Sequence, residues 1–131
     1  MIIFSDEIHA DLIYPGHQHH ALASISGHNA NIITAVAPSK TFNIPGLNLS
    51  ALIIPDKPSR TAITQAFNSL HVSASNPFSI AAFEAAYRDG EAWLKELLIY
   101  LRDTQDCVEN FLAQRLPEIK VIKAEGTYLL W

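Results

Sequence analysis

The chain has 131 residues, 49% of them hydrophobic and 17% charged, and a formal net charge of −4. This apolar content suits one packed domain or slightly more, and it excludes a disordered chain. The lysines and arginines form no basic stripe and no apolar run approaches the ~18 residues of a membrane-spanning helix, so we expect neither a nucleic-acid nor a membrane partner.

Three short apolar runs predict strands in the first half of the chain. Residues 2–4 immediately precede Ser5-Asp6, and residues 32–36 and 49–54 are rich in isoleucine, leucine, alanine and valine. Because such continuous apolar runs are typical of strands covered on both faces, we expect a buried sheet. Residues 14–31 contain a Pro-Gly pair and four histidines, and they predict a loop.

Helices are predicted over residues 58–70, 78–87 and 91–116. Asp56 is a suitable N-cap for the first helix, which starts near a proline. The third helix is amphipathic and would be roughly 40 Å long at 1.5 Å per residue, a length that suits a bridge between two domains. Beyond it, residues 119–121 and 127–129 predict two strands of a second, smaller unit.

Asp6 and Lys40 are the residues best suited to chemistry. Asp6 directly follows an apolar strand, and ligands in open α/β sheets bind outside the carboxyl ends of the strands. An acid there can hold a cationic ring nitrogen, or it can simply cap a turn. Lys40 lies between two apolar strands, where partial burial favours the free amine that a Schiff base requires. Most lysines, however, are solvated surface residues.

Both residues belong to longer motifs that occur in a fixed order. Residues 5–9 are SDEIH and residues 39–47 are SKTFNIPGL; AAY, GEAWL and EGTYL follow at 85–87, 90–94 and 125–129. With these motifs the chain resembles the pyridoxal-phosphate (PLP) enzymes of fold type I. Within them it is most similar to the cystathionine β-lyase-like (C–S lyase) branch of the class I and II aminotransferase family. The resemblance spans essentially the whole chain, as a central-to-C-terminal fragment of such an enzyme.

The resemblance implies roles for four residues. Asp6 would bind the protonated pyridine nitrogen of PLP. Lys40 would form the Schiff base with the cofactor and then move the α-proton of the substrate. His9 stands where typical aminotransferases have a tyrosine near the ring hydroxyl, so it would lie close to the ring. Ser39, directly before the lysine, would be a phosphate ligand.

Some family features are absent from this chain. Ala37 stands where many relatives have a serine, and Asn48 stands where many have an arginine that binds the phosphate. In the family, the glycine-rich phosphate loop and the ring-stacking residue come before the segment that residue 1 begins. The arginine that grips the substrate carboxylate comes after the segment that residue 131 ends. We therefore expect this chain to be part of a longer enzyme.

Two further segments leave alternatives open. His17, His19 and His20 form an H-x-H-H cluster, but a metal site would need a further ligand and a rigid frame. We expect no metal there and instead a loop over the cofactor cleft. Residues 75–77 (SNP) are either a helix-capping turn or the family loop that reaches the active site of the neighbouring subunit.

The sequence thus predicts an α/β fold. Residues 1–90 would be the later part of the layered PLP fold-type I large domain, and residues 91–131 the bridging helix and the start of an α+β small domain. Three functions remain open: a C–S β-lyase acting on cystathionine or related cysteine S-conjugates, an aminotransferase of amino acids, or a truncated, non-catalytic chain that only associates with partner chains. We expect a small amino-acid substrate and a homodimer in the full-length form. The single cysteine, Cys107, fits a cytoplasmic location.

Overall fold

The computed structural model describes residues 1–25, 31–73 and 76–131. The fold is mixed α/β, as the sequence predicts. Its elements in chain order are β1 (Ile3–Asp6), α1 (Leu22–Ile25), β2 (Ile32–Val36), β3 (Ala51–Ile53), α2 (Lys57–Ser69), α3 (Pro77–Asp89) and α4 (Glu91–Arg115).

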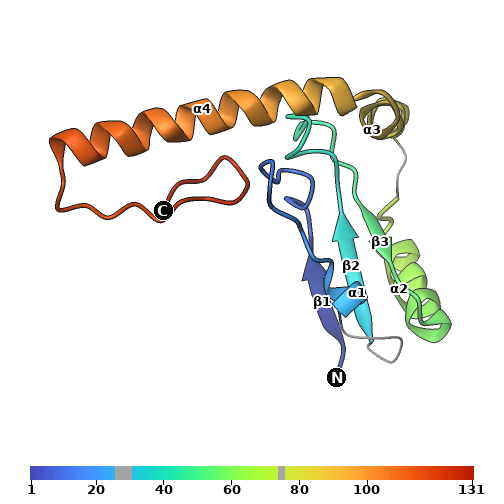
Figure 1. The fold of residues 1–131 in the computed structure, drawn as a ribbon. Helices are drawn as coiled ribbons and strands as arrows, with labels where there is room; N and C mark the ends of the chain where they lie inside the picture. The colour runs from blue at the N-terminus through green and yellow to red at the C-terminus, as the bar shows by residue number, and fades with distance from the viewer. Residues whose placement is uncertain (26–30, 74–75) are drawn as a thin grey trace.

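The three strands form one sheet in the order β1-β2-β3. β1 and β2 are parallel, with Asp6 opposite Ala35, whereas β3 runs antiparallel to β2, with Ala51 opposite Val36. The carboxyl ends of β1 and β2 therefore meet at one edge of the sheet. The long helix α4 passes over this edge and extends well beyond it, and the C-terminal segment folds back beneath α4 (Figure 1).

The prediction of a buried sheet holds for β2 and is wrong for β1 and β3. Ile32 and Ile33 in β2 are buried, but Phe4 in β1 is 59% exposed and Ile53 in β3 is 55% exposed. β1 and β3 are the edge strands, so each has a neighbour on one side alone. A groove of about 540 Å³, lined by Phe4 and by side chains of α2, also stays open against the sheet.

All three long helices are confirmed to within two residues at each end, and their caps explain why. The Asp56 carboxylate accepts a hydrogen bond from Ser59 N at 2.8 Å at the start of α2. The Asn76 side chain accepts one from Phe78 N at 3.0 Å at the start of α3. Asn76 thus serves as a helix cap, while the adjoining Ser75 lies outside the described residues. Gly90 ends α3 and is the N-cap of α4.

The remaining connections differ from the prediction. Residues 119–121 and 127–129 form no regular strand; next to the second range, Gly126 forms an isolated bridge with Ile13. A strand needs a partner strand, and the C-terminal segment bonds to the chain that follows β1 instead. The predicted loop over residues 14–31 contains the one-turn helix α1, and its residues 26–30 lie outside the described range.

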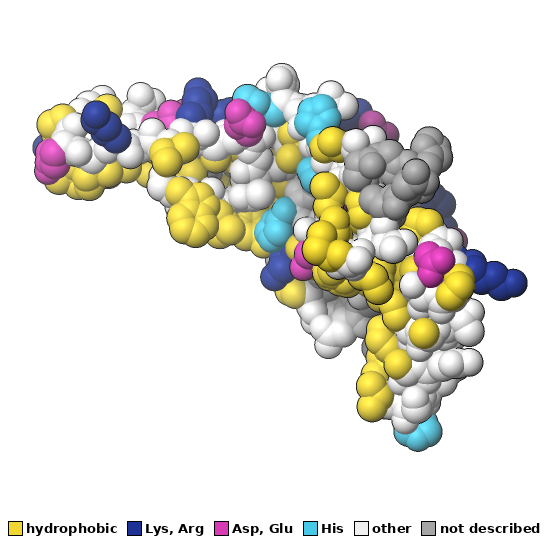
Figure 2. Space-filling model, turned by 90° about the horizontal axis from the view of Figure 1, so that it is seen from below, with side chains coloured by type: hydrophobic (Ala, Val, Ile, Leu, Met, Phe, Trp, Pro, Cys, Tyr) yellow, Lys and Arg dark blue, Asp and Glu magenta, His cyan; other side chains and the backbone are white. Residues whose placement is uncertain are grey.

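Much apolar surface is exposed. Hydrophobic side chains gather along the arm formed by α4 and the C-terminal segment, and also over the body of the molecule (Figure 2). They include Ile99, Tyr100 and Phe111 of α4, which are all more than half exposed. Within the described residues, no helix is both long and apolar enough to span a membrane.

Candidate active site

Asp6 is the last residue of β1, and its side chain is exposed at the carboxyl edge of the sheet. One carboxylate oxygen, Oδ1, accepts a long hydrogen bond of 3.3 Å from Ile8 N. Asp6 therefore does take part in a turn, as the simpler interpretation of the sequence suggests. Oδ2 makes no hydrogen bond to any described residue, so half of the carboxylate remains available to a cationic ligand.

Lys40 follows β2 at the same edge, in a loop that internal hydrogen bonds keep compact. Phe42 N donates to Pro38 O at 2.8 Å, and Ile44 N donates to Ser39 O at 3.0 Å. The Lys40 side chain is exposed and lines a hollow of about 300 Å³, which we call the Lys40 hollow. Its walls include Ser39, Lys40, Asn43, Trp93, Leu97 and Tyr128.

The residue after Lys40 is anchored to the segment that follows β1. Thr41 is completely buried, and its hydroxyl donates to Asp11 Oδ2 at 3.2 Å. The Tyr87 hydroxyl donates to the same oxygen at 3.4 Å. Burial, followed by the Asp11 charge and this hydrogen bond, raises the pKa of Tyr87 to about 12, so Tyr87 remains a neutral donor. Asp11 thus ties the Lys40 loop to the segment that follows β1.

Phe42, two residues after Lys40, is held by the junction of α3 and α4. Its ring lies 5.7 Å from the Tyr87 ring and 6.0 Å from the Trp93 ring, measured between centroids. Gly90 makes this approach possible, because a Cβ at position 90 would overlap both the Phe42 ring and the carbonyl oxygen of Ala86. Thr41 and Phe42 together fix the backbone that carries Lys40.

We predict that Gly90→Ala destabilises the full-length protein by about 1–3 kcal/mol, since the added methyl group overpacks the junction against Phe42. Thermal unfolding should show a lower midpoint than wild type. Gly46→Ala is the matched control, because a Cβ at position 46 meets nothing within 4 Å. An equal effect of both substitutions would show that contact with Phe42 is not the cause.

His9 and Ser39 lie near the same edge. The His9 ring is 5.6 Å from the Tyr128 ring, and its Nδ1 is buried with no hydrogen-bond partner in the described part of the chain. Ser39 is half-buried and lines the Lys40 hollow. It also lines a second hollow of about 310 Å³, which includes Asn48. The four residues selected from the sequence therefore all belong to the segments that leave the carboxyl ends of β1 and β2.

Glu7 connects the histidine-rich loop to β1. Its carboxylate accepts hydrogen bonds from the Ser5 hydroxyl at 3.0 Å and from Leu22 N at 3.1 Å, and it contacts His19 Nε2 at 2.9 Å. Burial raises the pKa of Glu7, but the three hydrogen bonds and the His19 charge outweigh it, so the net pKa is lowered. His17 lies 3.7 Å from Glu125. Two of the three clustered histidines thus face single carboxylates, and the described residues contain no group of three or more metal-ligating side chains.

The lowered pKa of Glu7 predicts a pH-dependent contribution to stability. A carboxylate whose pKa is depressed by folding stabilises the protein above its unfolded pKa, and the effect is lost as the pH falls through the folded pKa. Glu7→Gln should therefore cost about 1–2 kcal/mol near neutral pH and less under acidic conditions. Unfolding midpoints at several pH values would test this, with the exposed Glu118→Gln as control. A difference between wild type and Glu7→Gln that does not shrink as the pH falls below about 4 would contradict it.

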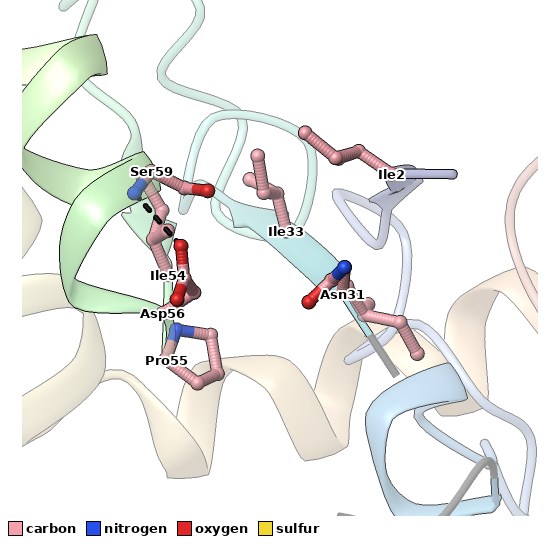
Figure 3. Close-up of a pocket in the computed structure, with 8 residues that line it drawn as sticks. Ile2, Asn31, Ile33, Ile54, Pro55, Asp56 and Ser59 are labelled. Carbon is pink, nitrogen blue, oxygen red and sulfur yellow. Dashed lines mark hydrogen bonds between the residues drawn. The ribbon is translucent and has the colours of Figure 1, made fainter. Parts of the chain in front are cut away.

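A further, smaller hollow lies at the opposite end of the sheet. It is about 20 Å³ in volume and is lined by Ile2, Asn31, Ile33 and Ile54, together with Asp56 and Ser59 at the start of α2 (Figure 3). A space of this size holds about one water molecule. The Asp56 carboxylate there already accepts a hydrogen bond from Ser59 N, and the volume is too small for a cofactor or substrate.

Comparison with known proteins settles the family. The sequence model of the family described as "Aminotransferase class I and II" matches residues 1–131. The chain belongs to this family. It is 43% identical over 130 residues to the cystathionine beta-lyase PatB of Bacillus subtilis, a match that covers 98% of this chain and 34% of that protein.

Solved structures of PLP-containing proteins share the fold of this chain. Cystalysin of Treponema denticola, which contains a pyridoxal 5′-phosphate cofactor, matches with a TM-score of 0.94 and 36% identity over 100% of this chain and 34% of its own. The PLP-bound C–S lyase of Staphylococcus hominis matches with a TM-score of 0.88 and 36% identity over 100% of this chain and 33% of its own. The chain thus spans about a third of the length of these relatives.

The side chains at this edge fit a PLP cofactor. The Lys40 amine lines a hollow large enough for a small molecule, the Asp6 carboxylate has an oxygen available, and the buried Nδ1 of His9 lacks a partner within the described chain.

Sequence patterns alone missed two residues at this edge: Asp11, which anchors the Lys40 loop, and Tyr128, which lines the Lys40 hollow. Tyr128 lies in the EGTYL motif, so the motif was a signal that could have pointed to this segment, which lines the hollow.

Proposed function

We propose that the full-length protein, by which we mean a chain of the relatives' length that carries residues 1–131, is a PLP-dependent C–S β-lyase. Its substrates would be cystathionine or related cysteine S-conjugates. The observation that carries the proposal is the position of Asp6 and Lys40 at the adjoining carboxyl ends of parallel strands β1 and β2. The 43% identity to a cystathionine beta-lyase supports the lyase branch.

In this proposal four side chains hold the cofactor. Lys40 bonds to it covalently, Asp6 pairs with its ring nitrogen, His9 lies beside the ring, and Ser39 donates to the phosphate. Bound PLP supplies an electron-accepting ring that stabilises a carbanion at the substrate α-carbon. Because Ala37 and Asn48 replace two frequent phosphate ligands of the family, most of the phosphate contacts would come from the other two thirds of the protein.

The Lys40 amine would then act as the general base. It removes the proton from the substrate α-carbon, after which the thiolate leaves from the β-carbon. The anchors on Thr41 and Phe42 hold the backbone of Lys40 in one place, and such orientation of a base is a large part of its effect. The apolar side chains of α4 in the hollow would limit the access of water.

The test is to supply cystathionine to the full-length protein loaded with PLP. A lyase releases pyruvate and ammonia with homocysteine as the thiol product. Efficient amino transfer to a 2-oxo acid without pyruvate release would instead favour an aminotransferase, the alternative that the family description supports. The two reactions share their first proton transfer, so a product assay separates them more clearly than any binding measurement.

A third possibility is a non-catalytic chain that only associates with partners. The exposed apolar side chains of α4 and the open groove beside Phe4 favour it for residues 1–131 expressed alone. We propose that the full-length form buries these surfaces, with residues 1–90 in its large domain and residues 91–131 leading into its small domain, and that it forms a homodimer. The 131-residue chain alone should bind PLP weakly and give no steady turnover.

A further inference from the structure

Tyr128 lines the Lys40 hollow although it lies 88 positions further along the chain than Lys40. Its ring also contacts His9, with 5.6 Å between the centroids and an angle of 58° between the planes. Tyr128 itself is 43% exposed, so packing against a core does not explain its position. The cause lies in the three residues before it.

Residues 125–127 are hydrogen-bonded to residues 12–14, and we call this pairing the latch. Thr127 N donates to Leu12 O at 2.6 Å, and Tyr14 N donates to Glu125 O at 3.0 Å. The Tyr14 hydroxyl adds a bond of 2.7 Å to Thr127 O. The two backbones approach so closely that a Cβ at Gly126 would overlap the carbonyl oxygen of Leu12. The latch therefore joins the C-terminal segment to the chain that leaves Asp6.

Thr127 has a φ of +63°, in the left-handed region that β-branched residues rarely adopt. Such strain persists where the surroundings enforce it, and it is concentrated at functional sites. Here the backbone bonds of the latch enforce it, and the Thr127 hydroxyl also accepts from Leu129 N at 3.1 Å. The strained turn comes directly before Tyr128 and sets the direction of its backbone.

The latch is also packed against α4. Tyr14 is only 2% exposed, and the Arg102 guanidinium lies 4.3 Å from the centre of its ring. In the part of α4 that precedes Arg102, the side chains Trp93, Leu97 and Leu101 recur every four residues and line the Lys40 hollow. The same helix thus supports the latch and forms the apolar wall opposite Tyr128.

The hollow combines an amine with an apolar interior. Lys40, Ser39 and Asn43 supply its polar groups, whereas Pro45 and the three α4 side chains are apolar. Among the described lining residues, the amine of Lys40 is the one charged group. A substrate whose α-carbon lies beside Lys40 would meet an apolar surface further along its side chain.

We propose that Tyr128 determines substrate specificity by packing against an apolar S-substituent of a cysteine conjugate, and that the latch, through Tyr14, positions it. This inference rests on the proposed lyase function and names the preferred substrates: cysteine thioethers with a bulky apolar substituent. Tyr128 forms one wall of the pocket for this substituent, and Trp93 and Leu97 form the other. Tyr14 acts on the substrate only through Tyr128.

The experiment compares two substrates in the full-length protein loaded with PLP, S-benzyl-L-cysteine and S-methyl-L-cysteine. Tyr128→Ala should lower kcat/KM for the benzyl compound by about tenfold or more and for the methyl compound by less than about threefold. Tyr128→Phe keeps the ring and should keep the preference. Tyr100→Phe, on an exposed tyrosine of α4, is the control. Equal losses for both substrates in Tyr128→Ala would overturn the proposal.

Binding provides a readout that does not depend on turnover. S-benzyl-α-methyl-L-cysteine has no α-proton and cannot be eliminated, and its Kd should rise by about tenfold in Tyr128→Ala. Tyr14→Phe should also raise this Kd. The double variant Tyr14→Phe/Tyr128→Ala should lose no more affinity for the analogue than Tyr128→Ala alone. An unchanged Kd in Tyr128→Ala would contradict the role of Tyr128. Additive losses of affinity in the double variant would contradict the role of the latch. If wild type binds this analogue with the expected dependence on Tyr128 but releases no pyruvate from S-benzyl-L-cysteine or cystathionine, the lyase proposal fails and the pocket stands.

Discussion

Replacing Lys40 with alanine in the full-length protein should reduce pyruvate release from cystathionine by about 10³-fold or more. A positioned general base contributes about 10²–10⁴-fold, and Lys40 would also lose its covalent bond to the cofactor. The substitution should leave the fold intact, because the Lys40 side chain is exposed and makes no hydrogen bond or ion pair with the described residues.

The assay for Lys40→Ala is steady-state pyruvate production, with the unfolding midpoint measured in parallel. Lys57→Ala is the matched control, since Lys57 is an exposed lysine at the start of α2, on a helix that contributes nothing to the Lys40 hollow. Activity of Lys40→Ala within tenfold of wild type would exclude Lys40 as the base.

The second large effect is expected at Asp6. Asp6→Ala should still bind PLP, because Lys40 remains, but turnover should fall by about 10²-fold or more. The physical reason is that a carboxylate next to the ring nitrogen keeps that nitrogen protonated, and the protonated ring is the stronger electron acceptor. Asp6→Asn separates charge from hydrogen bonding and should resemble Asp6→Ala.

Two measurements test the Asp6 variants. Absorbance titration with PLP gives cofactor affinity, and pyruvate production gives turnover. Asp103→Ala, on an exposed residue of α4, provides the control. Near-normal turnover of Asp6→Ala would mean that the ring nitrogen has another partner and that Asp6 serves only the turn with Ile8.

The helices could be predicted because their signals are local. A capping side chain and a proline mark the starts of α2 and α3, and Gly90 separates α3 from α4. The extended segments were harder to predict, because a strand depends on partners that are distant in the sequence. Residues 119–121 and 127–129 were predicted as strands, but residues 125–127 pair with residues 12–14 instead.

The same distinction applies to the candidate site. Asp6 and Lys40 could be selected because they lie in the SDEIH and SKTFNIPGL motifs that resemble the family, and parallel pairing of β1 and β2 brings these two segments to one edge. The contacts that hold the site together join residues far apart in the sequence. Asp11 and Thr41 are 30 residues apart, and Tyr14 and Thr127 are 113 apart. No local pattern encodes such pairs, so the anchoring of Lys40 and the role of Tyr128 required the structure.

The most direct test of the account is to identify the lysine that carries the cofactor. The full-length protein is incubated with PLP, reduced with borohydride and digested, and the labelled peptide is sequenced. The account predicts that the label is on Lys40, in the peptide that contains Ser39 and Thr41. A label on Lys57, Lys95, Lys120 or Lys123 instead would contradict it.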